Sequence, residues 1–232
     1  MLKSFIRLVL SKMNNYRYEI KFSLDERSYS EAMRWLKADT HAIKKYDDRC
    51  VNSIYFDDSN YSSVRDNISG FTHRTKHRLR WYNNKESSNG ETSPAFEKKI
   101  RNGRLGRKET IPLIGLKNNF LSDSLHIIES NVRLELQKAN VIFDNYYTSV
   151  LAIKYLREYY EDDFGLRITF DKDLEFSHID GLNCKLSSCP KLKYGRCIME
   201  LKFNADLKNY VSQLLSALNI SPTRNSKYLI GL

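Results

Sequence analysis

The segment from His73 to Tyr82 restricts the fold of this chain more than any other. It carries a basic side chain at every second position, namely Arg74, Lys76, Arg78 and Arg80. Because successive side chains of a β-strand point to opposite faces, these four share one face, while Leu79 and Trp81 share the other. Such a strand ordinarily buries its apolar face and exposes its charged face to water. Taken alone, the segment predicts only an amphipathic sheet.

A similar alternation recurs along the chain. Further strands are expected at residues 17–22, 51–57, 95–101, 153–159, 166–171 and 197–203, with a hairpin partner at 107–112. At least five of the expected strands present a face with Lys or Arg, and several of these faces also carry Glu. Helices are expected at 24–38, 59–67, 122–139 and 207–218, with apolar stripes that need a surface to cover. The pattern predicts an α+β protein.

Two architectures fit strands of this kind. An open sheet would carry the helices on its apolar side and leave the charged face in water. A closed barrel would place the apolar side outward beneath the helices and the charged side inward. Inward charge is costly unless it is paired or meets a counter-ion. Glu on the same strands offers pairing, the surplus of cations leaves room for a polyanion, and Glu200 could hold a divalent metal bound to that polyanion.

The composition also indicates a polyanionic partner. The 232 residues include 38 Lys and Arg against 28 Asp and Glu, a net charge of +10. Phosphate chains, nucleotides, nucleic acid and anionic membrane surfaces all fit this charge.

The four cysteines lack a recognisable zinc spacing and are expected to be free thiols in the cytoplasm. Residues 1–15 are expected to form a terminal helix, residues 16–232 a single domain, and no segment reaches the length of a transmembrane span.

Several kinds of site are disfavoured. The sequence has no glycine-rich phosphate loop of the Walker type and no evident arrangement of His, Ser and Asp for nucleophilic catalysis. Tyr82, Tyr155 and Tyr159 share strand faces with arginines, as stacking side chains of a nucleic-acid binder would. However, acidic residues at Glu19, Glu97 and Glu200 interrupt the basic faces, whereas a track for a nucleic-acid backbone would avoid them. Nucleic acid is therefore not the expected partner.

Short motifs on these strands, taken in order, resemble the VTC domain, the polyphosphate polymerase domain of the CYTH-like triphosphate tunnel superfamily. The matching segments lie at residues 17–22, 53–57, 78–82, 96–99, 155–158, 166–171, 198–203 and 226–228. The resemblance implies a closed antiparallel β-barrel, a triphosphate tunnel with surrounding helices. It also implies an ATP-dependent polyphosphate polymerase that transfers the terminal phosphoryl group of ATP to a growing polyphosphate chain with a divalent metal, Mn²⁺ or Mg²⁺.

The resemblance assigns roles to individual residues. The catalytic cations that also bind phosphate would be Lys21, Arg78, Arg80, Lys99, Arg157, Arg167 and Lys227. Lys202 and Arg224 would complete the phosphate-binding set. Glu200 corresponds to the metal-binding carboxylate of the family. Glu19 and Glu97 are either further metal ligands or partners that hold the lysines in place.

Two other functions remain open on the same residues. A triphosphatase would use the same tunnel, and a non-catalytic module would bind polyphosphate or nucleotide without turnover. The strand Arg17-x-Glu19-x-Lys21 favours the polymerase branch, because the other branch usually begins with Glu-x-Glu-x-Lys. The fungal relatives also carry a phosphate-sensing domain and membrane segments, neither of which is recognised here, so membrane-associated partner proteins stay unspecified.

Overall fold

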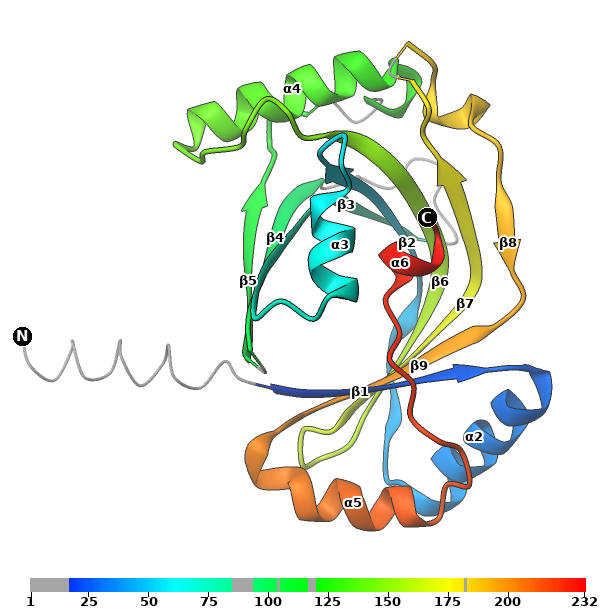
Figure 1. The fold of residues 1–232 in the computed structure, drawn as a ribbon. Coiled ribbons are helices and arrows are strands. Elements are labelled where there is room, and N and C mark those ends of the chain that lie inside the picture. Colours follow the sequence, from blue (N-terminus) through cyan, green and yellow to red (C-terminus); the bar gives the residue numbers. More distant parts are fainter. Residues whose placement is uncertain (1–16, 85–93, 104, 117–119, 182) are drawn as a thin grey trace, which may run out of the picture.

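The computed structural model describes residues 17–84, 94–103, 105–116, 120–181 and 183–232. The helix expected at residues 1–15 lies outside these residues. The described chain is built on one nine-stranded sheet (Figure 1). The strands are β1 Arg17–Leu24, β2 Ile43–Asp57, β3 His73–Asn84, β4 Ala95–Asn102, β5 Leu105–Pro112, β6 Thr148–Glu161, β7 Arg167–His178, β8 Leu192–Tyr194 and β9 Cys197–Asn204.

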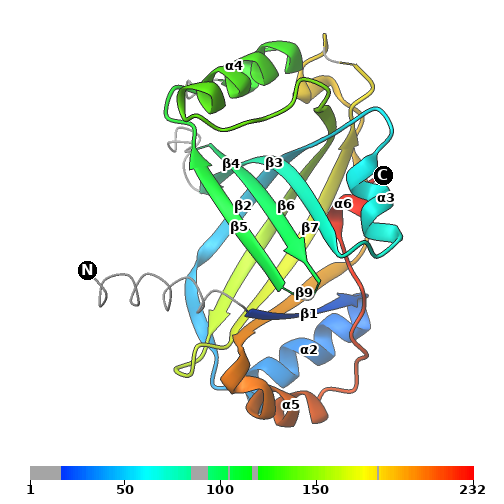
Figure 2. The same ribbon diagram turned by 60° about the vertical axis from the view of Figure 1, so that its left-hand side comes forward.

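All strand pairs are antiparallel, and their order is β1-β9-β7-β6-β2-β3-β4-β5, with β8 added beside β7. The sheet curves strongly (Figure 2). Its first and last strands in this order are β1 and β5. Within the described residues these two strands are not paired, and the expected closed barrel is therefore wrong in this respect. A side-chain contact joins β1 to β4, the neighbour of β5, since Lys99 Nζ of β4 lies 3.4 Å from Glu19 Oε2 of β1.

Five α-helices accompany the sheet, which confirms the predicted α+β class. They are α2 Glu26–Asp39, α3 Ser62–Ile68, α4 Leu125–Lys138, α5 Lys208–Ser216 and α6 Lys227–Ile230, with 3₁₀ turns η1 Phe120–Ser122, η2 Leu186–Ser188 and η3 Ala205–Leu207. Local capping sets where the longer helices begin. The Asp25 carboxylate accepts a hydrogen bond from the Ser28 backbone N–H at 2.9 Å, and Ser124 caps α4 in the same way.

The convex side of the sheet holds two apolar cores. Beneath α4, Leu79 and Trp81 of β3 pack with Ile128 and Val132 of the helix. Beneath α2 and α5, Phe170 of β7 packs in a second cluster of helix and strand side chains. Because the apolar face of every long strand is covered in this way, the charged face is left on the concave side (Figure 1).

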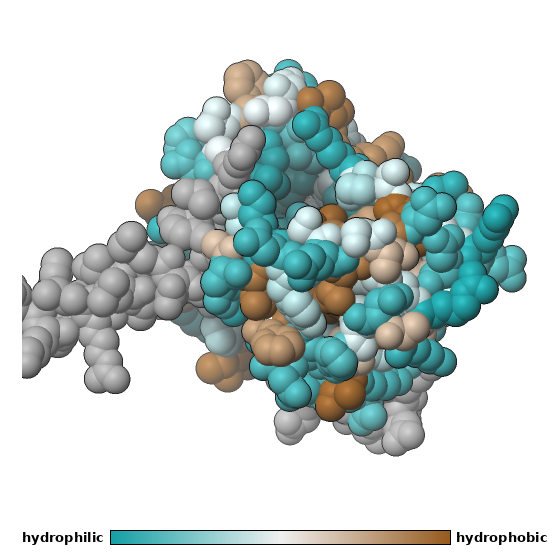
Figure 3. All heavy atoms as spheres, turned by 90° about the horizontal axis from the view of Figure 1, so that it is seen from below, coloured by the Kyte–Doolittle hydropathy of each residue, from teal (hydrophilic) through white to brown (hydrophobic). Residues whose placement is uncertain are grey.

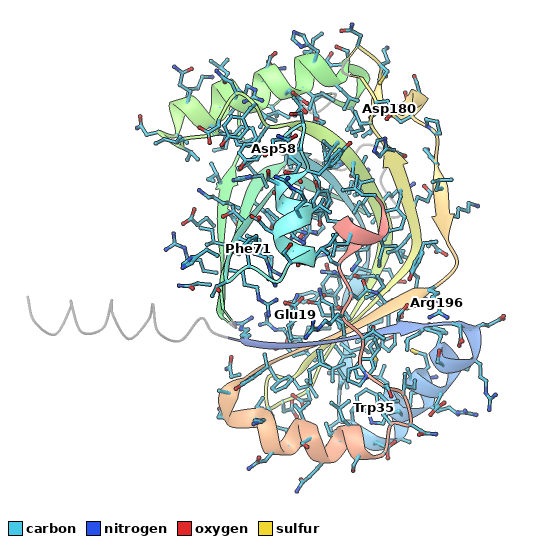
Figure 4. The ribbon with its side chains drawn as sticks, viewed as in Figure 1. Glu19, Trp35, Asp58, Phe71, Asp180 and Arg196 are labelled. Atoms are coloured by element: carbon cyan, nitrogen blue, oxygen red, sulfur yellow. The ribbon has the colours of Figure 1, made fainter. Side chains whose placement is uncertain are left out.

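A labelled pair of side chains shows this alternation directly. Glu19 points from β1 toward the concave side, while Trp35 of α2 lies on the other side of β1 (Figure 4). Trp35 is 3% exposed and donates a hydrogen bond from its indole N–H to the Leu214 carbonyl at 2.8 Å. Viewed from below, the surface is mainly hydrophilic with small separate hydrophobic areas (Figure 3). The apolar faces of the helices therefore pack against the core.

A third core fills one end of the concave side. Tyr228 of α6 is 1% exposed and stacks on Tyr55 of β2, with ring centroids 4.9 Å apart. Its hydroxyl donates a hydrogen bond to Asp57 at 2.5 Å, and Val64 of α3 packs against the same cluster. The C-terminal segment thereby anchors α6 inside the curved sheet.

Within the described residues no helix is long and apolar enough to cross a membrane, and all four cysteines are free thiols.

Candidate active site on the concave face

The strand register gathers the predicted charged residues on the concave face. Arg78 of β3 lies opposite Tyr55 of β2 and Glu97 of β4. Glu200 of β9 lies opposite Lys21 of β1 and Thr169 of β7. Since partners in register share a face, the charged sides of strands far apart in the sequence form one continuous surface.

One part of this surface is neutralised by a buried carboxylate. Asp171 has no exposed surface and accepts hydrogen bonds from Arg157 Nε at 2.5 Å and Nη2 at 2.8 Å. Lys227 Nζ lies 2.5 Å from its other side, and we call these three residues the Asp171 cluster. Burial alone raises the pKa of Asp171, but the charges of Arg157 and Lys227 outweigh it and lower that pKa to about 2. The cluster therefore keeps its charges paired at neutral pH.

A second carboxylate, Glu97 of β4, holds cations from the two neighbouring strands, β3 and β5. Arg78 Nε donates to Glu97 Oε2 at 2.7 Å, and Lys108 Nζ donates to Oε1 at 2.8 Å. Arg80 Nη1 lies 3.6 Å from Glu97 Oε2 and its Nε donates to Ser53. Burial raises the pKa of Glu97, yet these cations lower it to about 2. Both oxygens of Glu97 thus contact cations, as those of Glu19 do with Lys21 and Lys99.

Glu19 and Glu200 form a carboxylate pair at the opposite end of the sheet. Glu200 is 4% exposed, lies 3.0 Å from Lys202 Nζ, and its side chain interacts with that of Glu19. Glu19 Oε1 lies 2.8 Å from Lys21 Nζ. Burial alone would raise the pKa of Glu200, but Lys202, Glu19 and Lys21 hold it well below its ordinary value. Glu200 is therefore a carboxylate at neutral pH, with Glu19 beside it.

This carboxylate pair fits a hard divalent cation. No cluster of three or more His, Cys, Asp or Glu suited to a metal is present among the described residues. Mg²⁺ is commonly held by only one or two carboxylates, with phosphate oxygens of the substrate and water as its other ligands. Glu19 and Glu200 match that donor set, whereas Glu97 makes no described contact with either of them.

Three lysines are register partners on the neighbouring strands β3, β4 and β5. Lys76 of β3 is opposite Lys99 of β4, and Lys99 is opposite Lys108 of β5, so we call them the lysine row. Like charges directly opposite each other destabilise a sheet. Lys76 Nζ donates to the Ser226 hydroxyl at 3.0 Å. Burial, together with the charges of Lys99 and Lys21, lowers the pKa of Lys76 to about 8. Lys99 contacts Glu19 and Lys108 contacts Glu97, so among the described residues Lys76 is the member of the row without a carboxylate partner.

Lys76 and Tyr55 were missed as site residues in the sequence analysis. The sequence placed Lys76 on the basic face of residues 73–82. What distinguishes Lys76 is that another lysine, Lys99, lies opposite it on β4, and the sequence pattern does not show this pairing. Tyr55 accepts a hydrogen bond from Arg78 Nη1 at 2.9 Å. Burial raises the pKa of a phenol, but Arg78, Arg80 and Lys227 lower that of Tyr55 to about 7. No sequence signal marks Tyr55, because its strand carries no basic residue on that part of its face.

The remaining predicted residues lie at the edge of the charged face. Arg167 is exposed and lies 3.4 Å from Glu161, while its register partner on β9 is Lys202. Arg224 is exposed, and among the described residues it has no hydrogen bond or ion pair. The adjacent Thr223 N–H donates to the Lys21 carbonyl at 2.7 Å, which fixes where this segment crosses β1. The structure thus places these two arginines apart from the buried clusters.

A hollow of about 300 Å³ lies elsewhere, beside the ends of β2, β6 and β7. Its lining includes Asp58 and Asp180, which are labelled near the top of Figure 4, together with Tyr61. None of the predicted phosphate or metal ligands lines it. The hollow is therefore separate from the charged face.

Solved structures share this fold. A Pyrococcus horikoshii protein matches at 14% identity and a TM-score of 0.51, covering 92% of this chain and 96% of that one. A proposed adenylate cyclase from Vibrio parahaemolyticus matches at 12% identity and a TM-score of 0.52, covering 93% and 97%. A proposed adenylyl cyclase from Hippeastrum, with a dominant triphosphatase activity, matches at 14% identity and a TM-score of 0.52, covering 93% and 94%.

The sequence comparison is more specific than these structural likenesses. A search of the curated proteins found no significant match. The profile of the VTC domain, however, matches residues 16–232, which include every strand of the sheet. The resemblance noted from the strand motifs is thereby confirmed, and this chain belongs to the VTC domain family.

Proposed function

We propose that the chain is a metal-dependent polyphosphate polymerase that transfers the terminal phosphoryl group of ATP to a polyphosphate chain on the concave face. The observation that carries this proposal is the pairing of two features. The carboxylates of Glu19 and Glu200 lie together, and Lys99 of the lysine row contacts Glu19 at 3.4 Å. A metal-binding pair thus adjoins a row of cations that lacks full neutralisation. Membership of the VTC family supports the same chemistry.

The protein has little covalent work to do in such a reaction. The bond between the terminal phosphorus and its bridging oxygen breaks, a terminal oxygen of the acceptor chain forms the new bond, and ADP leaves. Catalysis then rests on positioning the phosphates and neutralising their charge. A divalent ion held by Glu19 and Glu200 would neutralise part of that charge. Lys21, Lys76 and Lys99 would bind the phosphate oxygens beside it.

The arginines have a complementary role. Arg78 and Arg80 have fixed guanidinium planes because Glu97, Ser53 and Tyr55 hold them. A planar guanidinium can bind two phosphate oxygens at once, whereas a lysine follows the phosphate as a mobile point charge. Together they would fix the triphosphate while the lysines accompany the transferred group.

Triphosphate hydrolysis is the second candidate. The Hippeastrum protein, which shares the fold, has a dominant triphosphatase activity. Hydrolysis would need the same cations and the same carboxylates, with water instead of polyphosphate as acceptor. The identity of the acceptor therefore separates the two candidates.

Purified protein incubated with ATP and Mn²⁺ or Mg²⁺ tests this directly, with the products resolved on a polyphosphate gel. A ladder of long chains formed together with ADP is the expected result. Free phosphate without chains would replace the polymerase with a triphosphatase. Absence of turnover, combined with thermal stabilisation by tripolyphosphate, would reduce the protein to a binding module.

Glu200→Gln is the matching variant. It removes a ligand charge from the carboxylate pair but keeps the shape of the side chain, so turnover should fall on the order of a thousandfold. Metal-free binding of tripolyphosphate should persist, since the cations remain. The control is Glu109→Gln on β5, where the carboxylate is largely exposed and contacts Arg107. Full turnover by Glu200→Gln would remove its proposed role.

A further inference from the structure

Three tyrosines gather where β2 begins and β6 ends. Tyr46 is 48% exposed and Tyr82 is 37% exposed, which is unusual for two large rings so close to a buried charged face. Tyr46 packs edge-on against Tyr159, with ring centroids 5.8 Å apart. Tyr82 of β3 and Tyr155 of β6 are both opposite Val51 of β2, so Tyr82 lies on the same face of the sheet as Tyr159. Tyr46 and Tyr159 therefore form an aromatic pair, with Tyr82 on the same face.

An arginine completes this group. The Arg49 guanidinium lies 5.1 Å from the centroid of Tyr46 and 5.9 Å from that of Tyr159. Contacts of this kind between a cation and a ring are attractive. Arg49 makes no ion pair with a carboxylate among the described residues. We call Arg49, Tyr46, Tyr82 and Tyr159 the aromatic mouth.

The aromatic mouth lies away from α3 and α6. Figure 2 shows the start of β2 and the turn between β6 and β7 on the side opposite these two helices. Tyr228 of α6 fills the other end of the concave side. A ligand that enters past the tyrosines would therefore reach the charged residues without displacing α6.

The mouth is continuous with the proposed phosphate site. Tyr159 and Arg157 share a face of β6 two residues apart, a separation of about 7 Å along a strand. Arg157 lies 5.8 Å from the centroid of Tyr159, and its register partner on β2 is Arg49. Beyond it, Arg80 Nη2 donates to the Tyr155 hydroxyl at 3.3 Å. From Tyr159 the surface thus continues past Arg157 and Tyr155 to Arg80, one of the proposed phosphate-binding arginines.

We infer that the aromatic mouth binds the nucleobase of a nucleoside triphosphate whose phosphates lie on the concave face. This inference rests on the proposed function and adds to it the part of the substrate that is not phosphate. Exposed rings offer a base their flat faces, and the Arg49 guanidinium offers a second planar group for stacking. Stacking tolerates every base, so ATP and GTP should bind alike, and both should bind more tightly than inorganic tripolyphosphate.

The test compares two ligands on matched variants. Calorimetry in Mg²⁺ measures the dissociation constants of adenosine 5′-(β,γ-imido)triphosphate and of tripolyphosphate. Tyr46→Ala combined with Tyr82→Ala should weaken the nucleotide analogue about five- to hundredfold, as expected for lost base stacking, and leave tripolyphosphate within twofold. Tyr46→Phe should retain nucleotide affinity, because it keeps the ring. Tyr146→Ala is the control, since Tyr146 is 59% exposed and lies outside the site.

The outcomes separate this inference from the proposed function. If the wild-type protein binds neither ligand, the proposed function fails. If it binds tripolyphosphate while the double variant keeps full affinity for the nucleotide analogue, only the nucleobase site is overturned. An equal loss for both ligands would also overturn it, because it would show damage to the phosphate site. Arg49→Gln provides an independent variant, with the same selective loss expected, should the double variant fail to fold.

Discussion

The Asp171 cluster and the lysine row lie on the same face of one sheet but differ in how closely their positive charges are paired with carboxylates. Asp171 receives both Arg157 and Lys227, at distances of 2.5 Å each. In the lysine row, Lys76 and Lys99 oppose each other across a strand pair, and the hydrogen-bond acceptor of Lys76 is the neutral Ser226 hydroxyl. The first arrangement is complete as it stands. The second gains from the arrival of an anion.

The pKa directions agree with this contrast. In the Asp171 cluster, Asp171 has its pKa lowered to about 2 and Arg157 has its pKa raised well above its ordinary value. Both shifts favour the charged forms. In the lysine row, burial is the largest cause that lowers the pKa values of Lys76 and Lys99, which disfavours their charged forms. We therefore propose that basic residues on one surface divide into those that stabilise the fold and those that bind a ligand.

Breaking the Asp171 cluster should have the largest effect. Asp171→Asn leaves Arg157 and Lys227 buried without a counter-charge and should lower the free energy of unfolding by about 3–5 kcal/mol. The pKa of Asp171 in the folded protein, about 2, lies below the ordinary aspartate pKa of 3.8. Its contribution is therefore complete above about pH 4 and is lost as the pH falls through 2. Urea unfolding at pH 7 and in acid measures both effects.

The control for this variant lies two residues along the same strand. Asp173 is exposed, so Asp173→Asn should change the free energy of unfolding by less than about 0.5 kcal/mol. Similar stabilities for Asp171→Asn and the wild-type protein would contradict a structural role for the cluster.

Removing a charge from the lysine row should have a smaller effect of the opposite sign. Lys76→Met relieves repulsion and should raise the free energy of unfolding at pH 7 by about 1–2 kcal/mol, allowing for solvent screening. The pKa of Lys76 in the folded protein, about 8, is below the ordinary lysine pKa of 10.5. The unfolded chain therefore binds more protons between these values, and wild-type stability should rise with pH across them. The variant should lack this rise.

Lys98→Met is the matched control, because Lys98 lies on the opposite face of β4 from Lys99. Chemical denaturation between pH 7 and pH 10 compares the three proteins. A clear loss of stability in Lys76→Met would show that Lys76 serves the fold.

Periodicity alone placed most of the charged face correctly. Lys21, Arg78 and Glu200 come from strands far apart in the sequence, yet alternation and pairing bring them to one side. That the end strands β1 and β5 are not paired with each other could not be predicted in this way. Whether the end strands pair depends on curvature and on irregular pairing, such as the register shifts in β2 and β6, and these leave no periodic signal.

Two other features could not be predicted from the sequence, namely where each strand begins and ends and which side chains lie opposite each other on neighbouring strands. β2 begins at Ile43, but its first residues are polar and exposed, and only later does the strand enter the core. The role of Lys227 was inferred from its family motif, whereas its contact with Asp171 depends on the α6 helix folding back into the sheet. The importance of Lys76 likewise depends on Lys99, because a lysine facing an acid would have had an ordinary role.

The central claim is that Lys76 and Lys99, which oppose each other in the lysine row, bind the phosphates of the substrate. Calorimetric titration with tripolyphosphate tests this most directly, comparing the wild-type protein, Lys76→Met combined with Lys99→Met, and Lys98→Met. The account predicts equal binding by the wild-type protein and Lys98→Met, and affinity at least about tenfold weaker in the double variant, since charge-assisted contacts are lost. Equal affinity in all three proteins would contradict it.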